Sequence, residues 1–418
     1  MAVLARTLER RGHRTTFLGF PDMAPRLPPG LSFRPFAEQD QPPGSLDAYL
    51  KRLARLGGPI STWRLIRDLA GFSDVICREL PAALDRLAPD ALIIDQTDAA
   101  ASLVATALGI PFANVANALP LNLEPGVPPP VLPWPYDPSA RGLRRNRGGY
   151  RVARLVERPI TKVIRRHADR LGRPDIRFAD ETWSTRLQIT QCVRGLDFPR
   201  QLLPAGFHYL GPFRDPDAPL DFALPADGEP VIFCSLGTLQ GSRAGIFRAV
   251  AAAAAAFDVT LVIAHGGLLA ESQVAGLRDR PIVRPYVPQR ALLARSALAI
   301  THAGFNTVMD ALSFGVPMIA LPITFEQPAT AARLERAGAA VALQRRRGVA
   351  RIRAAIREVI GNPLYRDGAR RLQAEVGTAG GVSRAADLIE ASLAAAEAPT
   401  TASRASGDAR DDSRNGSS

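Results

Sequence analysis

The sequence predicts an α/β protein with two domains. Short apolar runs of strand length alternate with helical patterns along most of its 418 residues, as in parallel sheets whose strands are joined by helical crossovers. The chain is longer than one ordinary core requires, which favours two domains. A stretch rich in Pro and Asp between Gly211 and Gly228 separates the two halves and is typical of a linker.

The first half begins with an amphipathic helix that carries Leu4, Ala5 and Leu8 on one face and ends at Gly12. Gly109 is placed to end a later helix, with Pro111 just beyond it. The prolines between 120 and 135 exclude a regular helix and predict a surface loop. The expected strands are residues 15–20, 91–94, 112–115 and 187–192, and the expected helices are residues 46–70, 72–87, 99–108 and 141–172.

The second half repeats the alternation. Its expected strands are residues 231–234, 259–264, 281–283, 298–300, 318–321 and 340–343, and its expected helices are residues 246–257, 306–314, 350–360, 364–376 and 382–396. The residues after 397 contain almost nothing apolar, which predicts disorder. The expected organisation is an N-terminal domain over 1–212, a linker over 213–228, a C-terminal domain over 229–396 and a tail over 397–418.

Composition excludes several classes of protein. The net charge of +12 comes almost entirely from arginine, and the arginines are spread along the chain without interleaved aromatic residues, so we expect no nucleic-acid partner. The net positive charge would still attract phosphorylated ligands and an anionic membrane surface. The three cysteines lack metal or disulfide spacing. With no signal peptide and no membrane-spanning run in the sequence, we expect a cytoplasmic protein, with peripheral contact at the inner face of the membrane.

The stretch from Thr301 to Gln327 is the most informative part of the chain. It predicts a strand, a short loop, a helix, a second strand and a second loop. In parallel sheets such loops lie at the carboxyl ends of strands, where ligands bind. Small Gly304 permits close backbone approach, and His302, Asn306 and Thr307 offer donors beside a helix N-terminus, so a phosphate group is the expected guest. An isolated histidine would more often be structural.

Further candidate residues lie at other predicted strand ends. Ser235 and Thr238 flank a turn that suits a phosphate or a sugar, although a plain turn before a helix is equally consistent. Tyr286 could stack on a planar base whose edge pairs with the backbone of Val287, or be an ordinary core tyrosine. Asp310 could reach a ribose hydroxyl pair or be a solvated carboxylate. Asp95 could orient a histidine base, or serve as a turn residue.

Two common nucleotide-binding motifs and a metal site are not expected. The chain has no GxGxxG after a first strand and no GxxxxGK[ST]. It also has no acidic cluster of the kind that holds a divalent cation. We therefore expect no cofactor and no metal.

Together these residues resemble the donor signature of the UDP-glycosyltransferase superfamily, whose GT-B fold sets two Rossmann-like domains across a cleft. The segment from Tyr286 to Gln289 resembles its aromatic-x-Pro-Gln element, which implies that Tyr286, Val287 and Gln289 frame uracil. The segment from His302 to Thr307 resembles its diphosphate element. The resemblance further implies that Asp310 binds the ribose and that Glu326 and Gln327 bind the sugar, without a metal.

Within that superfamily the sequence is similar to the bacterial zeaxanthin glucosyltransferases. The supporting phrases are NALPLN from Asn117, SLGTLQG from Ser235, AHGGL from Ala264 and EQP from Glu326. They imply an inverting transfer of glucose from UDP-glucose to the hydroxyl of an apolar carotenoid. The alternatives are a glycosyltransferase of a macrolide or another secondary metabolite, a sugar-nucleotide epimerase, and a nucleotide-sugar or lipid-binding protein without catalysis.

One departure from the family concerns the start of the chain. Members begin with an apolar strand and a loop that carries a catalytic histidine, before a helix that ends Arg-Gly-His. This sequence opens inside that helix and reaches Arg11, Gly12 and His13 at its end. We therefore expect the first strand and the base to be missing, through a misassigned start, a truncation or a true loss of activity. Of these we favour the misassigned start, and we expect the 418-residue form to be poorly active and less stable than a form extended upstream.

The acceptor is expected to contact the proline-rich loop over 120–135 and the basic segment over 141–172. Phe112, Trp134 and Tyr136 are the candidate apolar contacts. Arg144, Arg145 and Arg147 could bind anionic lipid headgroups, or they could be a solvated basic face.

Overall fold

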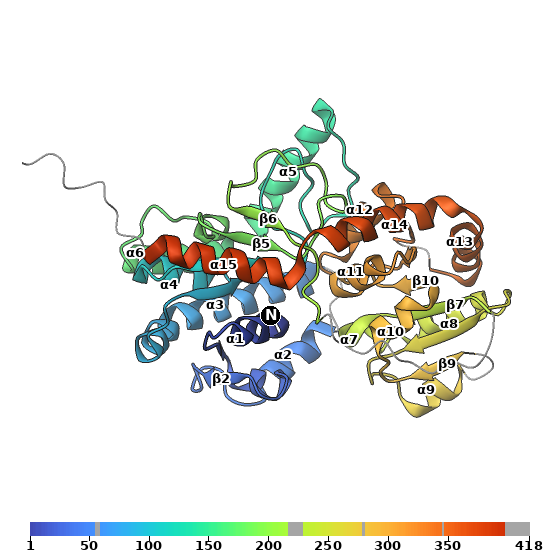
Figure 1. Ribbon diagram of the computed structural model, residues 1–418, viewed down its shortest axis with the longest axis horizontal. Coiled ribbons are helices and arrows are strands. Elements are labelled where there is room, and N and C mark those ends of the chain that lie inside the picture. The colour runs from blue at the N-terminus through green and yellow to red at the C-terminus, as the bar shows by residue number, and fades with distance from the viewer. Residues whose placement is uncertain (55–58, 216–228, 278–280, 345–346, 398–418) are drawn as a thin grey trace, which may run out of the picture.

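The computed structural model describes residues 1–54, 59–215, 229–277, 281–344 and 347–397. These residues form two α/β lobes that lie side by side (Figure 1). The predicted tail, except Glu397, and residues 216–228 of the predicted linker lie outside the described residues. The domain boundaries given above therefore stay a prediction.

The C-terminal lobe is built on a six-stranded sheet in which every pairing is parallel. Its strand order is β12-β11-β10-β7-β8-β9. The strands are β7 (Val231–Ser235), β8 (Thr260–Ala264), β9 (Ile282–Arg284), β10 (Ser296–Thr301), β11 (Met318–Ala320) and β12 (Ala340–Ala342). The helices are α7 (Gly237–Gln240), α8 (Ala244–Ala254), α9 (Glu271–Ala275), α10 (Gln289–Ala294), α11 (Phe305–Ser313), α12 (Gln327–Arg336), α13 (Val349–Gly361) and α14 (Pro363–Thr378).

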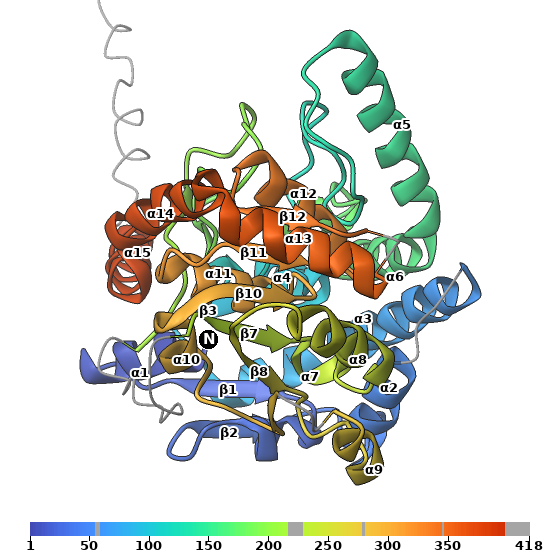
Figure 2. The ribbon, with the colours of Figure 1, turned by 90° about the vertical axis from the view of Figure 1, so that its right-hand side faces the viewer.

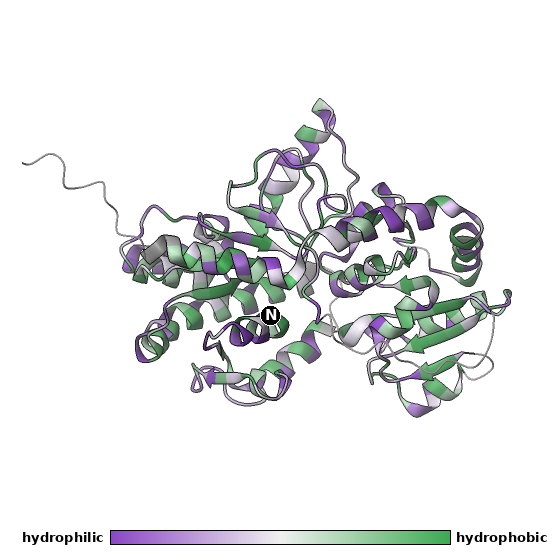
Figure 3. Ribbon diagram, in the orientation of Figure 1, coloured by the Kyte–Doolittle hydropathy of each residue, from purple (hydrophilic) through white to green (hydrophobic). Residues whose placement is uncertain are grey.

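Two hydrophobic clusters hold this sheet, one on each face. One contains Phe233, Val262 and Met309, and the other contains Ile232, Ile263 and Ile300. Side chains along β7 therefore alternate between the faces, as a strand buried on both sides requires. Figure 3 shows the strands of this lobe as its most hydrophobic elements.

The N-terminal lobe contains two separate parallel sheets among the described residues. One has the strand order β3-β4-β5-β6, and the other pairs β1 with β2. The strands are β1 (Thr16–Gly19), β2 (Ser32–Pro35), β3 (Leu92–Asp95), β4 (Phe112–Ala116), β5 (Gln188–Thr190) and β6 (Phe207–Tyr209). The helices are α1 (Ala2–Arg10), α2 (Ser45–Ala54), α3 (Pro59–Leu87), α4 (Ala99–Leu108), α5 (Ala140–Val156) and α6 (Arg158–Arg170), with short 3₁₀ turns at Pro21–Arg26 and Ala179–Thr182.

The last helix, α15 (Gly381–Glu397), returns to the N-terminal lobe. It follows α14 across the molecule and lies along the N-terminal lobe, as Figure 1 shows. Its Ala385 and Ile389 share a hydrophobic cluster with Leu4 and Leu8 of α1. Arg11 also donates to Asp387 and Glu390 of α15 at 2.8 Å each. The chain therefore crosses between the lobes twice.

The α/β prediction is confirmed, and the elements differ from expectation in a few places. The predicted helix break near Gly71 is wrong, because α3 runs without interruption from Pro59 to Leu87. Conversely, the predicted single helix over 141–172 is two helices, since Pro159 occupies the first turn of α6 and favours a new start there. The strands β2 and β6 were not expected, because their sequences, SFRP and FHY, are not the apolar runs by which most of the other strands were recognised.

No helix in the described parts of the chain is both long and apolar enough to span a membrane. The three cysteines are buried and unpaired. Cys192 and Cys234 lie within hydrophobic clusters, as expected of plain core residues.

Candidate active site

The predicted donor residues gather at one edge of the C-terminal sheet. Because the strands of this sheet are parallel, their carboxyl ends share an edge. Ser235 ends β7, His302 follows β10, and the loop before α12 follows β11. The sheet order also places β10 beside β7, although β8 and β9 come between them in sequence. This is the point where the strand order reverses direction, and ligands of open α/β sheets bind at such points.

His302 is packed between two glycines at this edge. A Cβ added to Gly304 would lie 2.3 Å from its Nε2, and one added to Gly237 would lie 2.8 Å from its Cε1. Neither glycine can therefore carry a side chain while the ring keeps this position. Burial lowers the pKa of His302 to about 4, although a hydrogen bond to the backbone of Ser235 partly opposes that shift. The imidazole is therefore neutral near pH 7.

Strained backbone marks the two loops that flank the site. Ala303 has φ 63° and Phe325 has φ 57°, in the left-handed region that non-glycine residues seldom adopt. Such conformations cost about 1 kcal/mol or more each and concentrate at functional sites. At Ala303 the conformation joins β10 directly to the first turn of α11, which begins at Phe305. The amide groups of that turn then point toward the edge where a ligand would lie.

A polar network joins three of the predicted motifs. The Thr307 hydroxyl donates to Gln289 Oε1 at 3.3 Å, and Gln289 Nε2 donates to Asp310 Oδ2 at 2.7 Å. Arg214 Nε donates to Asp310 Oδ1 at 2.5 Å. Arg214 Nη2 also contacts Asn306 Oδ1 at 3.2 Å. The structure thus brings the ribose and diphosphate candidates together, and it adds an arginine that sequence reasoning missed.

Tyr286 lies at the end of β9 with 68% of its surface exposed. Its hydroxyl donates to the Gly266 carbonyl at 3.0 Å, and its ring lies against Gly267. An accessible aromatic ring held at its far end suits stacking on a base better than it suits a core tyrosine. Val287 is half-buried beside it, and Thr238 is exposed in the turn after β7.

Glu326 and Gln327 lie at the start of α12, on the loop after β11. Gln327 Oε1 accepts hydrogen bonds from the backbone amides of Ile323 and Thr324, each at 2.9 Å. Its oxygen therefore shapes the loop, and its Nε2 is the group left for a ligand. Burial raises the pKa of Glu326 above its ordinary value. A hydroxyl-rich ligand would offer the hydrogen bonds that its buried carboxyl group needs.

Asp95 is the last residue of β3, in the N-terminal lobe. Its Oδ1 accepts from the Thr97 amide at 2.8 Å, and its Oδ2 accepts from Asn117 Nδ2 at 2.5 Å. The amino group of Met1 is buried nearby. Burial lowers the pKa of this amino group, Arg214 lowers it further and Asp95 raises it. Asp95 and Arg214 therefore both act electrostatically on the amino group of Met1.

None of the five histidines is within hydrogen-bonding reach of Asp95 in the described structure. His13 pairs with Glu390 at 3.0 Å, and His167 pairs with Asp74 at 2.7 Å. His208 lies in β6, away from the β3 edge, and His265 and His302 belong to the C-terminal sheet. The expected base and the strand before Met1 are therefore untested and stay a prediction.

The three candidate acceptor contacts are not brought together. Phe112 starts β4 and packs in the cluster around Leu84, at the opposite end of the strand from Asn117. Phe112 therefore does not lie where an acceptor contact was expected. Trp134 lies against Gly149 of α5, under Arg145. The ring centroids of Tyr136 and Phe198 are 5.7 Å apart. The guanidinium carbon of Arg336, on α12, lies 5.3 Å from the Tyr136 centroid.

A buried cluster of charged side chains that was not predicted from the sequence lies beside the proline-rich loop. Asp197 Oδ1 accepts from Arg333 Nε of α12 at 2.8 Å, and its Oδ2 accepts from Arg200 Nε at 2.7 Å. Arg200 also donates to the carbonyl oxygens of Asn122 and Pro120, at 2.7 and 3.2 Å. The proline-rich loop and the helix that carries Gln327 are thus attached to one carboxylate.

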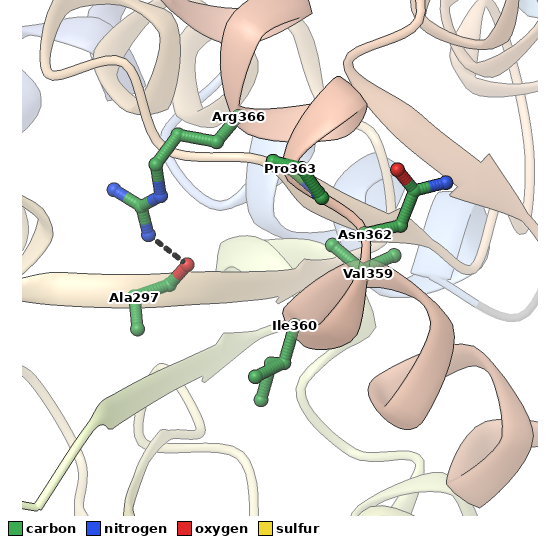
Figure 4. Close-up of a pocket in the computed structure, with 6 residues that line it drawn as sticks. All are labelled: Ala297, Val359, Ile360, Asn362, Pro363 and Arg366. Atoms are coloured by element: carbon green, nitrogen blue, oxygen red, sulfur yellow. Dashed lines mark hydrogen bonds between the residues drawn. The ribbon is translucent and has the colours of Figure 1, made fainter.

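A cavity of about 230 Å³ lies at the opposite edge of the C-terminal sheet (Figure 4). Arg366 crosses it to bond the Ala297 carbonyl at 2.7 Å. Ala297 is near the amino end of β10, whereas His302 follows its carboxyl end, so this cavity is not the candidate site. Separately, the described residues contain no group of three or more His, Cys, Asp or Glu side chains placed to hold a metal ion. The metal-free expectation stays a prediction.

Comparison with known proteins decides the family. The profile described as UDP-glucoronosyl and UDP-glucosyl transferase matches residues 152–375. A zeaxanthin glucosyltransferase of Pantoea ananas is 37% identical over 394 residues, which cover 93% of this chain and 91% of that protein. The chain belongs to the UDP-glycosyltransferase family. A second zeaxanthin glucosyltransferase, from Pseudescherichia vulneris, is 38% identical and covers 94% of each chain.

Solved glycosyltransferases agree on the fold. A calicheamicin glycosyltransferase superposes with a TM-score of 0.72 at 22% identity, covering 95% of this chain and 94% of its own. The kitacinnamycin glycosyltransferase gives a TM-score of 0.69 at 23% identity, with 94% and 95% covered. These matches confirm the GT-B expectation of two Rossmann-like domains for this UDP-glycosyltransferase.

Proposed function

We propose that this glycosyltransferase moves glucose from UDP-glucose to a hydroxyl group of a carotenoid such as zeaxanthin. The observation that carries the proposal is the convergence of the residues that match the family's donor motifs at one sheet edge, beside Arg214. The two zeaxanthin glucosyltransferases match nearly the whole chain, including the N-terminal half, where we expect the acceptor to bind. That extent supports a shared acceptor class.

Each part of the donor has a proposed place. Uracil stacks on Tyr286 and pairs with the backbone of Val287, while Asp310 and Gln289 hold the ribose. The diphosphate lies over the first turn of α11, where Gly304 allows close approach and amide groups supply partial positive charge. Ser235 and Thr238 border it from β7. The glucose hydroxyls reach Glu326 and Gln327.

The proposed reaction inverts the configuration at the anomeric carbon of the sugar. The acceptor oxygen attacks that carbon, the bond from the carbon to the phosphate oxygen breaks, and UDP leaves with the electron pair. The acceptor proton passes to a base beside Asp95, whose carboxylate would orient it. Charge that develops on the departing diphosphate is stabilised by donors from Asn306, Thr307 and the α11 amides. We propose that these donors replace a metal ion.

The neutral state of His302 adds a condition. If one ring N–H donates to the Ser235 backbone, the second nitrogen of a neutral imidazole is an acceptor and repels phosphate oxygen. In that tautomer, His302 can donate a hydrogen bond to the diphosphate only once it is protonated. The negative charge of the donor favours that protonated form, so donor binding should carry a proton into the site.

The acceptor is proposed to lie along the proline-rich loop. Tyr136, directly after that loop, lies 5.3 Å from Arg336 at the end of α12, the helix whose first residue, Gln327, is proposed to bind the sugar. Trp134 is the second contact, between this loop and α5. We propose that these two side chains select an apolar acceptor by contact area rather than by hydrogen bonds.

We also propose a cytoplasmic enzyme that touches the inner face of the membrane through α5. Figure 2 shows this helix projecting from the body of the protein. Val152 and Leu155 are each 61% exposed near its end, and Arg147 and Arg151 are exposed on the preceding turns of the same face. Arg145 is excluded, because it bonds the Pro135 carbonyl at 2.8 Å and covers Trp134. Apolar side chains beside arginines suit an anionic bilayer.

Flotation with anionic and neutral vesicles tests this contact. Leu155→Asp should abolish flotation with anionic vesicles, because it places a negative charge among the contacts. Leu364→Asp is the matched control, since Leu364 is 67% exposed on α14. If the unchanged protein does not float, or if the two variants float equally, the membrane contact is refuted.

A UDP-release assay tests the function itself. A form of the protein extended upstream of Met1 is incubated with UDP-glucose and other nucleotide sugars, against zeaxanthin and a panel of macrolide and aromatic aglycones. We expect release with zeaxanthin and UDP-glucose, and His302→Ala should abolish it by removing the phosphate contact. Release only with a macrolide or aromatic aglycone would favour the secondary-metabolite alternative. UDP binding without release from any pair would favour a non-catalytic binding protein.

A further inference from the structure

Arg214 lies outside every motif that identified the donor site. It lies in the predicted linker, after β6 and one residue before the described segment 59–215 ends. Its side chain nonetheless reaches into the C-terminal lobe and is only 22% exposed. Nε is bonded to Asp310 at 2.5 Å, and Nη1 donates to the Phe213 carbonyl at 3.1 Å. An arginine that crosses a domain boundary to meet two donor-binding residues requires an explanation.

The charge balance of the site suggests one. A nucleotide diphosphate brings at least two negative charges to the loop between Thr301 and Thr307, which contains no arginine and no lysine. The first turn of α11 supplies only about half a positive charge. His302 is neutral before the ligand arrives, because burial lowers its pKa to about 4. Arg214 is a permanent cation, and it already contacts Asn306 within the diphosphate element.

The contacts also show which part of the guanidinium is available. Nη2 meets the Asn306 carbonyl at 3.3 Å and the Asn306 side-chain oxygen at 3.2 Å, at or beyond the long end of ordinary N–H···O bonds. A phosphate oxygen forms shorter and stronger bonds with guanidinium than an amide does. Asp310 accepts two bonds in this state, and a carboxylate offers about four positions. Ribose hydroxyls can therefore reach Asp310 while Arg214 stays attached to it.

We propose that Arg214 is a donor-binding residue whose Nη2 turns from Asn306 to an oxygen of the nucleotide diphosphate. The inference rests on the proposed function, since it takes the donor to be a nucleotide sugar at this edge. The bound diphosphate would then be held by α11 on one side and by Arg214 on the other. Donor binding would add a phosphate contact to the bond that already joins Arg214, after β6, to Asp310.

Binding measurements with two ligands test this. UDP and uridine share the base and the ribose, and only UDP carries phosphates. Calorimetry compares the unchanged protein with Arg214→Gln, which keeps polar reach without charge, and with Arg214→Lys, which keeps the charge without the fork. Arg366→Gln is the control, because Arg366 also bonds a backbone carbonyl but at the amino end of β10.

Arg214→Gln should weaken UDP roughly 10- to 100-fold and leave uridine within about twofold, as expected for the loss of a charged hydrogen-bond partner. The UDP affinity of Arg214→Lys should lie between that of Arg214→Gln and that of the unchanged protein. Arg366→Gln should alter the affinity for neither UDP nor uridine. Equal weakening of UDP and uridine would overturn the proposal, because it would make Arg214 a support for Asp310 alone. Tighter binding of both would overturn it too, by showing that Arg214 blocks the site.

The failure of the proposed function looks different. The unchanged protein would then bind neither UDP nor uridine, and the assignment of Arg214 would fall with it. If Arg214→Gln does not fold, the lysine variant decides the question. Weaker UDP binding with unchanged uridine binding would support the proposal, and unchanged binding of both would contradict it.

Discussion

Asp197→Asn should destabilise the protein more than any other conservative substitution at a carboxylate with an ion pair in the described residues. Asp197 is fully buried, and so is Arg333, while Arg200 is 2% exposed. The carboxylate oxygens of Asp197 also accept hydrogen bonds from the Tyr209 hydroxyl at 2.9 Å and from the Phe198 amide at 2.8 Å. Burial alone would raise the pKa of Asp197, but the charges of Arg200 and Arg333 outweigh burial and hold it below its ordinary value.

The size of the effect follows from what the substitution leaves behind. Asparagine has nearly the same shape, but two buried guanidinium groups then lose their counter-charge. Removing one partner of a buried ion pair costs about 3–5 kcal/mol. That is a large part of the roughly 5–15 kcal/mol by which proteins are stable. For lobes of this size the cost corresponds to a fall of roughly 6–20 °C in the unfolding temperature.

Thermal unfolding followed by circular dichroism measures this. Asp175→Asn is the matched control, because it makes the same change in an Arg–Asp pair of 2.7 Å whose carboxylate is 61% exposed. Exposed pairs contribute about 0–1 kcal/mol, so the control should shift the midpoint by only a few degrees. If the two variants unfold within about 2 °C of each other, the buried cluster does not contribute the stability derived above.

Three further predictions concern the donor site. Gly304→Ala should weaken UDP binding about 10-fold with little loss of stability, because the new Cβ would lie 2.3 Å from the imidazole of His302. Gly245→Ala, with open space around the new Cβ, is the control in calorimetry. Equal UDP affinity in the two variants would contradict the packing argument. The pKa of His302 is about 4 in the free protein, and the diphosphate should raise it, so affinity for UDP-glucose should rise as pH falls from the raised pKa towards the free one. Calorimetry in buffers of different ionisation enthalpy should detect proton uptake that His302→Gln removes, and binding without proton uptake would refute this. Dialysis against EDTA should leave UDP release unchanged, and a loss restored by Mg²⁺ would show that a metal is needed after all.

Much of the donor half was predictable because its signals are local. A strand end, a glycine and a helix start lie within a few residues at Thr301–Asn306, and each has a direct physical meaning in a parallel sheet. The same reasoning placed β7, β8 and β11 within one or two residues. Gln289 and Asp310 were also recognisable from their motifs, and the structure joins them at 2.7 Å.

The features that were missed depend on contacts between distant residues. Asp197 and Arg333 are 136 positions apart, and Arg214 and Asp310 are 96 apart. In a chain with so many arginines, none of these stands out by its neighbours in sequence. The strain at Ala303 was invisible for a different reason, since alanine gives no signal for a left-handed backbone. Phe112 was misplaced because an apolar residue at a strand start looks the same as one at a strand end.

The central claim is that a nucleotide diphosphate binds over the first turn of α11, between Gly304 and Arg214. A crystal structure of the protein with UDP tests it directly. The account predicts phosphate density against the amide groups that follow Gly304, with His302 and Arg214 in contact and uracil on Tyr286. Density for UDP at any other edge of the sheet, including the cavity beside Arg366, would contradict it.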